Sequence, residues 1–176
     1  MKDQLLIRAC KENSYQAQLK IYHQFKNLLF NAAYRILKNE QDAQDMVHDA
    51  FIKAFQRITQ LEDEANLGGW LKRIAINCSL DLIKKKRKLS WMEDHPKLLP
   101  DYEEETYEIY PSIHQIMEGI AELKDKYRIV LILFLIEDYS HKEIAEMLAI
   151  NETIVRNQYR RGRLQLKEIL QKERIA

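Results

Sequence analysis

The residues best suited to a chemical role lie near the end of the sequence, where arginine and amide side chains occur together. No acidic residue occurs between Thr153 and Lys167. Guanidinium groups bind phosphates and the edges of guanine, and an amide pairs with adenine. The candidate DNA-contacting residues are Arg156, Asn157, Arg160, Arg161 and Arg163. On a helix that enters the major groove, we expect all of these side chains to face outward.

The segment that contains these residues, 139–166, has the pattern of a helix-turn-helix. A short helix with one apolar face is followed by a break and by a second, longer apolar stripe. Ser140 and Glu143 form a predicted capping box for the first helix, and Asn151 is a predicted N-cap for the second. At the turn, Ala149 stands where Gly would accept a left-handed backbone at lower cost. An ordinary helical hairpin with a solvated basic face is the alternative.

A second set of polar side chains lies on a helix that is predicted to begin at Trp70. Arg73, Asn77 and Lys84 fall on its exposed side at steps of four and seven, and Lys84 starts the basic run KKKRK. An amide and cations aligned beside an irregular loop suit a single DNA strand. The lysines alone are also explained by a basic helix end that complements the helix dipole.

A stripe of carboxylates follows the helix that is predicted over residues 40–59. Asp42, Asp45 and Asp49 recur at steps of three and four, opposite a regular apolar stripe. Spacing alone favours a solvated face with carboxylates near the helix N-terminus, and a docking surface for a basic partner is the alternative. A metal site is rejected, because His48 points elsewhere on the helix and no second cluster supplies ligands.

The elements that position these groups are all expected to be helical. Only 4 Gly and 3 Pro occur among the 176 residues, and no alternating β-branched run of strand length appears. We predict an all-α fold of two small helical domains, residues 1–88 and 112–176. An acidic linker, residues 89–111, joins them and contains every proline. The second domain ends in the helix-turn-helix.

Periodicity places the individual helices. A loop is expected over residues 60–69, where Gly68 and Gly69 allow a sharp turn into the next helix. The stretch 127–137 is almost uniformly apolar and is expected at the buried centre of the second domain. Beyond the helices named above, we predict helices over residues 3–11, 15–37, 112–124 and 127–137.

Several classes of protein are disfavoured by composition. The net charge is only +1, but opposite charges are sorted into blocks. Blocks of this size usually face partners or solvent instead of a core. No nucleophile–base pair, phosphate loop or metal cluster occurs, so we expect neither an enzyme nor a cofactor. No apolar run approaches the ~20 residues of a membrane span, and no signal peptide is recognisable. Cys10 and Cys78 lie within helical patterns, which indicates reduced core thiols in a cytoplasmic protein.

Three motifs in order resemble a known family. DAQDMVHDAFIKAF, GGWLKRIAINCSLDLIKKKRK and LKDKYRIVLILFLIEDYSHKEIAEMLAINETIVRNQYRRGRLQLK together resemble the extracytoplasmic-function (ECF) group of bacterial RNA polymerase sigma factors. The resemblance implies a protein that binds core RNA polymerase and directs it to promoters. It implies that the first domain binds the polymerase clamp and melts the minus-ten element. The second domain would read the minus-thirty-five element as duplex.

The same resemblance assigns roles to residues. Asp42, Asp45, His48 and Asp49 match the polymerase-binding segment. Arg73, Asn77 and Asp81 match the helix that contacts the minus-ten strand, and the loop at residues 60–69 matches one that captures a flipped base. Arg156, Asn157, Arg160 and Arg161 match recognition-helix positions. The implied partners are core RNA polymerase, promoter DNA and an anti-sigma factor, without membrane insertion.

The sequence also departs from the family pattern. Thr153-Ile154 replaces a common Gly-Thr, Gln158 replaces Arg, and His48 replaces Gln or Glu. Gly162 replaces a common Ala, which is expected to loosen the recognition helix by about 1 kcal/mol. Two other functions stay open: a dimeric regulator that binds palindromic DNA without polymerase, and a helical interaction protein without DNA contact.

Overall fold

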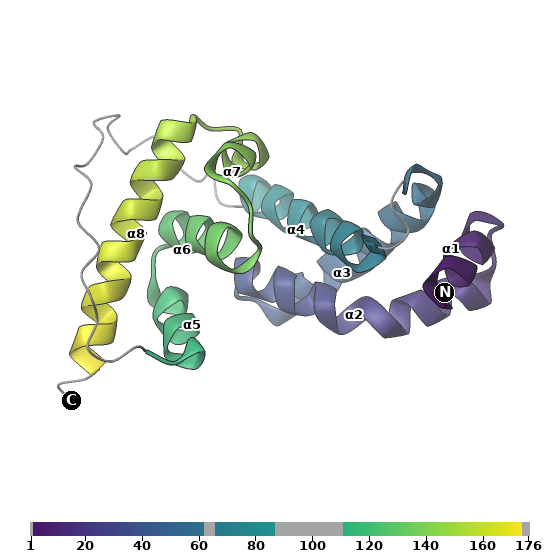
Figure 1. Ribbon diagram of the computed structural model, residues 1–176, viewed down its shortest axis with the longest axis horizontal. Coiled ribbons are helices and arrows are strands. Elements are labelled where there is room, and N and C mark those ends of the chain that lie inside the picture. Colours follow the sequence, from purple (N-terminus) through teal and green to yellow (C-terminus); the bar gives the residue numbers. More distant parts are fainter. Residues whose placement is uncertain (1, 62–65, 87–110, 174–176) are drawn as a thin grey trace. The chain divides into compact units, whose positions relative to one another are not determined.

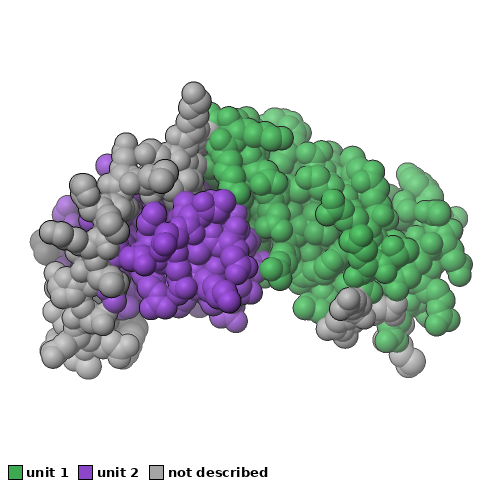
Figure 2. Space-filling model, turned by 90° about the horizontal axis from the view of Figure 1, so that it is seen from above, with its two compact units in different colours: residues 1–88 green, residues 89–176 purple. Residues whose placement is uncertain are grey.

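The computed structural model describes residues 2–61, 66–86 and 111–173, and all regular elements within these ranges are helical. The chain forms two compact units, unit 1 over residues 1–88 and unit 2 over residues 89–176 (Figure 2). The predicted all-α class is therefore confirmed. The acidic linker predicted over residues 89–111 lies outside the described residues, apart from Pro111.

Unit 1 is a bundle of long helices (Figure 1). It consists of α1 (Lys2–Lys11), α2 (Tyr15–Leu37), α3 (Glu40–Gln56), the short 3-10 helix η1 (Ile58–Gln60) and α4 (Leu67–Lys86). Helices α2, α3 and α4 pack against one another, and α1 packs on α2. Their shared core includes Ile21, Leu29, Phe51 and Leu71, each at most 3% exposed. The three long helices therefore hold their outer faces in a fixed arrangement.

The ends of these helices are set by local polar groups. Asn39 caps α3, because its side-chain oxygen accepts a hydrogen bond from the backbone N–H of Asp42 at 2.8 Å. Lys38, with φ of 52°, takes the left-handed conformation that ends α2. The turn between α2 and α3 is therefore short and well defined.

The start of α4 differs from the prediction. The helix begins at Leu67 instead of Trp70, so Gly68 and Gly69 lie in its first turn, and neither has a positive φ. A Cβ added to Gly68 would lie 3.0 Å from Cε1 of Phe25. This glycine therefore allows α4 to pack closely against α2, and it does not form a sharp turn. Residues 62–65 of the predicted loop lie outside the described residues.

Both cysteines are free and buried, as predicted. Burial raises the pKa of the Cys10 thiol. Lys53 donates a hydrogen bond from Nζ to Sγ of Cys78 at 3.3 Å, which joins α3 to α4. No helix in the described parts of the chain is both long and apolar enough to cross a membrane.

Unit 2 is arranged around its last helix (Figure 1). It contains α5 (Ile113–Glu122), α6 (Asp125–Leu131), the π-helical turn η4 (Ile132–Ile136), α7 (His141–Leu148) and α8 (Glu152–Glu173). Helix α8 packs on α5, α6 and α7. Residues 127–133 are all buried, which confirms the first part of the predicted centre of this domain. Leu135, in the second part of the predicted stretch 127–137, is 45% exposed. One of them is charged: Arg128 is 1% exposed, and its Nη2 lies 2.7 Å from Oδ1 of Asp125.

Gly162 lies where α8 crosses α6. A Cβ on this residue would lie 3.2 Å from Cγ of Leu131 and 3.3 Å from Cβ of Tyr127. Any side chain would push these neighbours apart by a few tenths of an ångström. The glycine costs helix propensity, as expected from the sequence, but it also lets the two helices approach closely.

The turn of the helix-turn-helix carries backbone strain. Ala149 ends α7 in the left-handed conformation, with φ of 56° and ψ of 44°. We expect Ala149→Gly to raise the free energy of unfolding of unit 2 by roughly 0.5–1 kcal/mol, because relief of the Cβ clash exceeds the added entropy of the unfolded chain. Chemical denaturation of the full chain, with amide hydrogen exchange in α7 and α8, measures the change.

Glu146→Gly provides the control for this prediction. Glu146 is exposed within α7, where glycine should cost about 1 kcal/mol. If glycine is destabilising at both positions, the strain assigned to the turn is wrong.

Candidate functional site

The cations of α8 lie partly on the protein surface. Arg156 and Arg163 are exposed, and Arg160 and Arg161 are half-buried. Residues 156, 160 and 163 are separated by four and three positions, so they share one side of the helix. This arginine face is available to phosphates and to base edges in a groove of DNA.

The two exposed arginines are oriented by their own helix. Nε and Nη2 of Arg156 lie 3.1 and 2.7 Å from Oε1 of Glu152. The guanidinium of Arg163 lies over the ring of Tyr159, 5.8 Å from its centroid. Both side chains are therefore partly ordered before a partner binds.

The prediction that Asn157 faces outward is wrong. Its side chain is 1% exposed, and that of its neighbour Gln158 is 0% exposed. Each residue turns the helix by about 100°, so Asn157 lies well around the axis from Arg156. A run of consecutive polar residues on a helix does not form a single face. Asn157 therefore leaves the set of candidate DNA contacts.

The helix-turn-helix is fixed by the local signals predicted from the sequence. Glu143 donates its backbone N–H to Oγ of Ser140 at 3.3 Å, and Ser140 donates its N–H to Oε2 of Glu143 at 2.9 Å. This reciprocal pair is the predicted capping box of α7. Oδ1 of Asn151 accepts from the N–H of Thr153 at 2.7 Å, which supports the predicted N-cap of α8.

An aromatic cluster, formed by Phe134, His141 and Tyr159, joins three elements of unit 2. The ring of His141, the first residue of α7, stacks on Phe134 of η4 with centroids 4.4 Å apart and planes 14° apart. Tyr159 of α8 lies 4.6 Å from Phe134 and 5.1 Å from His141, between ring centroids. No partner in the described residues bonds the buried Nε2 of His141. The cluster therefore suits a neutral imidazole.

Lowering the pH should reduce the stability of unit 2, because His141 becomes protonated. The pKa of His141 is lowered from 6.5, first by burial and then by Arg156 and Arg160, while Glu152 acts in the opposite sense. The unfolded chain therefore takes up a proton at a higher pH than the folded chain. The resulting stability is present above about pH 6.5 and is lost as the pH falls toward the folded-state pKa. Hydrogen exchange in α7 and α8 between about pH 8 and about pH 5 measures the loss.

His141→Phe keeps a ring in the cluster and removes the titrating group. This variant should show a flatter dependence of unit 2 stability on pH. His114→Gln is the matched control, because His114 is exposed on α5 and its side chain is 81% accessible. Acid sensitivity that survives His141→Phe, or that disappears with His114→Gln, contradicts the assignment.

The outer side of α4 carries the polar set predicted for a DNA strand. Arg73, Asn77 and Lys84 are all exposed. Asp81 is exposed on the same side, and its Oδ1 lies 3.8 Å from Nζ of Lys84. This face therefore carries a cation and an amide at Arg73 and Asn77, and charges of both signs at Asp81 and Lys84. Lys85 and Lys86 are further cations in the last turn of the helix.

The outer side of α3 is acidic. Asp45, His48 and Asp49 are exposed, whereas Asp42 is partly buried and pairs through Oδ1 with Nζ of Lys86. Ile52, one turn beyond His48 and Asp49, is 57% exposed. Sequence reasoning missed Ile52, although its position outside the apolar stripe of α3 was a usable signal. Ile52 adds one apolar side chain beside these carboxylates.

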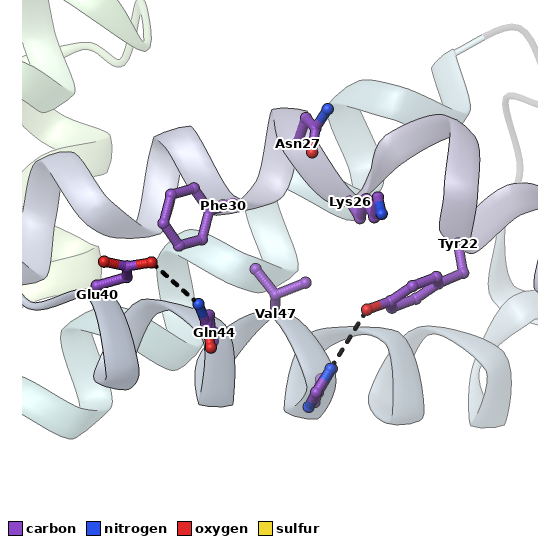
Figure 3. Close-up of a pocket in the computed structure, with 8 residues that line it drawn as sticks. Tyr22, Lys26, Asn27, Phe30, Glu40, Gln44 and Val47 are labelled. Carbon is purple, nitrogen blue, oxygen red and sulfur yellow. Dashed lines mark hydrogen bonds between the residues drawn. The ribbon is translucent and has the colours of Figure 1, made fainter.

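A cavity of about 400 Å³ adjoins this acidic side, between α2 and α3 (Figure 3). Nε2 of His48 lies 3.3 Å from the hydroxyl oxygen of Tyr22, and Gln44 donates to Glu40 at 3.3 Å (Figure 3). The residues that line the cavity are Tyr22, Lys26, Asn27, Phe30, Glu40, Gln44, Val47 and His48. The acidic side of α3 therefore continues into a hollow with both apolar and polar walls.

The described residues contain no group of three or more His, Cys, Asp or Glu side chains that could hold a metal ion. Asp45, His48 and Asp49 instead present charge and hydrogen-bonding groups to the solvent. Such a surface suits a macromolecular partner with basic side chains.

Sequence comparison identifies relatives along most of the chain. The family described as Sigma-70 region 2 matches residues 21–89, and the family described as Sigma-70, region 4 matches residues 113–166. The ECF RNA polymerase sigma factor SigW of Bacillus subtilis is 29% identical over 179 aligned residues, which cover 93% of this chain and 94% of SigW. The two matched regions fall in unit 1 and unit 2 respectively, apart from residue 89.

Solved structures share the fold. CnrH, in a complex with the cytosolic domain of CnrY, superposes with a TM-score of 0.54 at 22% identity and covers 97% of both chains. The sigma factor RpoE of Bartonella quintana, in a complex with the anti-sigma factor NepR, has a TM-score of 0.54 at 18% identity. It covers 86% of this chain and 95% of RpoE. At these identities the likeness supports the fold alone.

Proposed function

The chain belongs to the ECF group of bacterial RNA polymerase sigma factors, and from this premise we propose which of its surfaces meets which partner. As a sigma factor it binds core RNA polymerase and directs it to promoters. Its role is regulatory, with the catalysis of RNA synthesis left to the polymerase. The proposal concerns the division of this work between the two units.

The observation that carries the proposal is the separation of charge among helices. Helix α3 exposes Asp45 and Asp49, whereas α4 exposes Arg73 and α8 exposes Arg156. Carboxylates attract a basic protein surface, and guanidinium groups attract phosphates. Unit 1 thus has one face suited to protein and another suited to DNA, and unit 2 has a face suited to DNA.

We assign the acidic side of α3 to the polymerase. The docking surface consists of Asp42, Asp45, His48, Asp49 and Ile52. The exposed apolar side chain of Ile52 would lie at the dry centre of the interface, with the charged groups toward its rim. The same surface, with the adjoining cavity, is our candidate for an anti-sigma factor, which would then exclude the polymerase. A partnership with polymerase also places the protein in the cytoplasm.

The basic faces of α4 and α8 are assigned to two parts of one promoter. Arg73, Asn77 and Lys84 would hold the minus-ten strand once it is unpaired, which costs a few kcal/mol. Residues 60–69 are proposed to capture a flipped base. The minus-thirty-five duplex would be read by Arg156, Arg160, Arg161 and Arg163. Anchoring by unit 2 positions unit 1 at the site that is melted.

Reconstitution with core RNA polymerase tests this function. We expect the purified protein to co-elute with core enzyme and to make it start discrete transcripts from genomic DNA fragments, which core enzyme alone does not produce. Sequence-specific duplex binding without association with core enzyme would instead support a dimeric regulator. Absence of both activities would support an interaction protein without DNA contact.

A further inference from the structure

One ion pair in unit 1 joins the helix assigned to polymerase with the helix assigned to DNA. Asp42 lies in the first turn of α3, and Lys86 is the last residue of α4. Nζ of Lys86 contacts Oδ1 of Asp42, and the two side chains are 54% and 23% exposed respectively. The pair thus lies at the surface and connects residues that are 44 positions apart in the sequence.

While the ion pair is formed, each of the two side chains is engaged by the other. A lysine that is bound to a carboxylate is less available to a DNA phosphate, and the carboxylate is less available to a basic side chain of another protein. Surface ion pairs contribute only about 0–1 kcal/mol, so a basic side chain of the polymerase can displace Lys86 from Asp42. Asp45 and Asp49, which are more exposed, would attract the polymerase before Asp42 is engaged.

We propose that Asp42 and Lys86 form a latch, which opens when core polymerase binds Asp42 and thereby frees Lys86 to bind a phosphate of the melted strand. The inference rests on the proposed assignment of α3 to polymerase and α4 to DNA. Because coupling between two sites is reciprocal, DNA binding at Lys86 also favours polymerase binding at Asp42. The latch lowers DNA binding by the free protein.

The free protein tests the latch without polymerase. The probe is a short single-stranded oligonucleotide of mixed sequence, whose affinity is measured by fluorescence anisotropy across a salt series. Each phosphate contact on a single strand adds about 0.7 to the slope of log affinity against log salt. Asp42→Asn should steepen the slope by about that amount. Lys86→Met in the same chain should return the slope to that of the unaltered protein.

Glu12→Gln is the matched control, because Glu12 is an exposed carboxylate of unit 1 with no assigned role. It removes the same charge between α1 and α2, outside α3 and α4. A slope for Asp42→Asn no steeper than that for Glu12→Gln overturns the latch. Equal midpoints of chemical denaturation for these variants exclude a change of fold as the cause.

A second arm uses the holoenzyme, assembled with saturating core polymerase. Lys86→Met should lower the slope by about 0.7, whereas Lys86→Arg, which keeps both the ion pair and the phosphate contact, should leave it unchanged. An unchanged slope for Lys86→Met overturns the latch while the assignment of the surfaces survives. If the unaltered protein fails to co-elute with core enzyme, the proposed function and the latch fall together.

Discussion

Replacement of Arg156 by alanine is expected to lower the affinity of the holoenzyme for the upstream duplex element by about 1–3 kcal/mol, or roughly 5- to 150-fold. Arg156 is exposed on the arginine face of α8, and Glu152 holds its guanidinium along the helix. Such a fork can bind a base edge through two hydrogen bonds or neutralise a phosphate. Competition binding with promoter fragments that differ only in the upstream element measures the effect.

Three companion variants sharpen this prediction. Lys172→Ala removes a cation from the exposed end of the same helix and should leave affinity nearly unchanged. Arg156→Lys should keep the salt dependence but lose discrimination between bases, because an ammonium lacks the fork. Glu152→Gln combined with Arg156→Ala shows how much of the loss comes from an unpaired carboxylate facing DNA. Equal losses for Arg156→Ala and Lys172→Ala would remove α8 from the recognition surface.

Reversal of charge on α3 is expected to have the other large effect. The double change Asp45→Lys and Asp49→Lys should weaken binding to core polymerase by about 3 kcal/mol, or roughly 100-fold, because like charges across an interface cost several kcal/mol. Both side chains are exposed, so the helix should keep its structure. Titration of labelled protein with core enzyme measures the affinity.

The control for this reversal is Glu12→Lys, which places a new cation on unit 1 between α1 and α2, outside α3. It should bind core enzyme with nearly unaltered affinity. Oligonucleotide binding by the free double variant should be no weaker than that of the unaltered protein, since its added charge is positive. Full polymerase binding by the double variant would falsify the assignment of α3.

Most of the helices were predictable because their signals are local. Ser140, Glu143, Asn151 and the left-handed Ala149 act within one turn of the backbone, and the structure places them as the sequence indicates. The apolar stripe of α3 likewise repeats at a spacing that only one helix phase satisfies. These features depend little on the rest of the molecule.

Other features depend on which neighbours the fold supplies. The burial of Asn157 and the need for glycine at residue 68 follow from helix packing, which no local pattern records. The burial of Arg128 was not predictable, because this residue lies in an apolar run and its burial depends on an ion pair with Asp125. The contact between Asp42 and Lys86 was also not predictable, because it joins segments that are far apart in the sequence.

The most direct test of the division of labour is a footprint of the holoenzyme on one promoter selected in vitro. Nuclease protection reports the upstream duplex, and permanganate reactivity of thymines reports the melted strand. Arg73→Ala combined with Asn77→Ala should keep upstream protection and abolish thymine reactivity, whereas Arg156→Ala should weaken upstream protection first. Loss of upstream protection in the Arg73 and Asn77 variant, with thymine reactivity intact, would contradict the account.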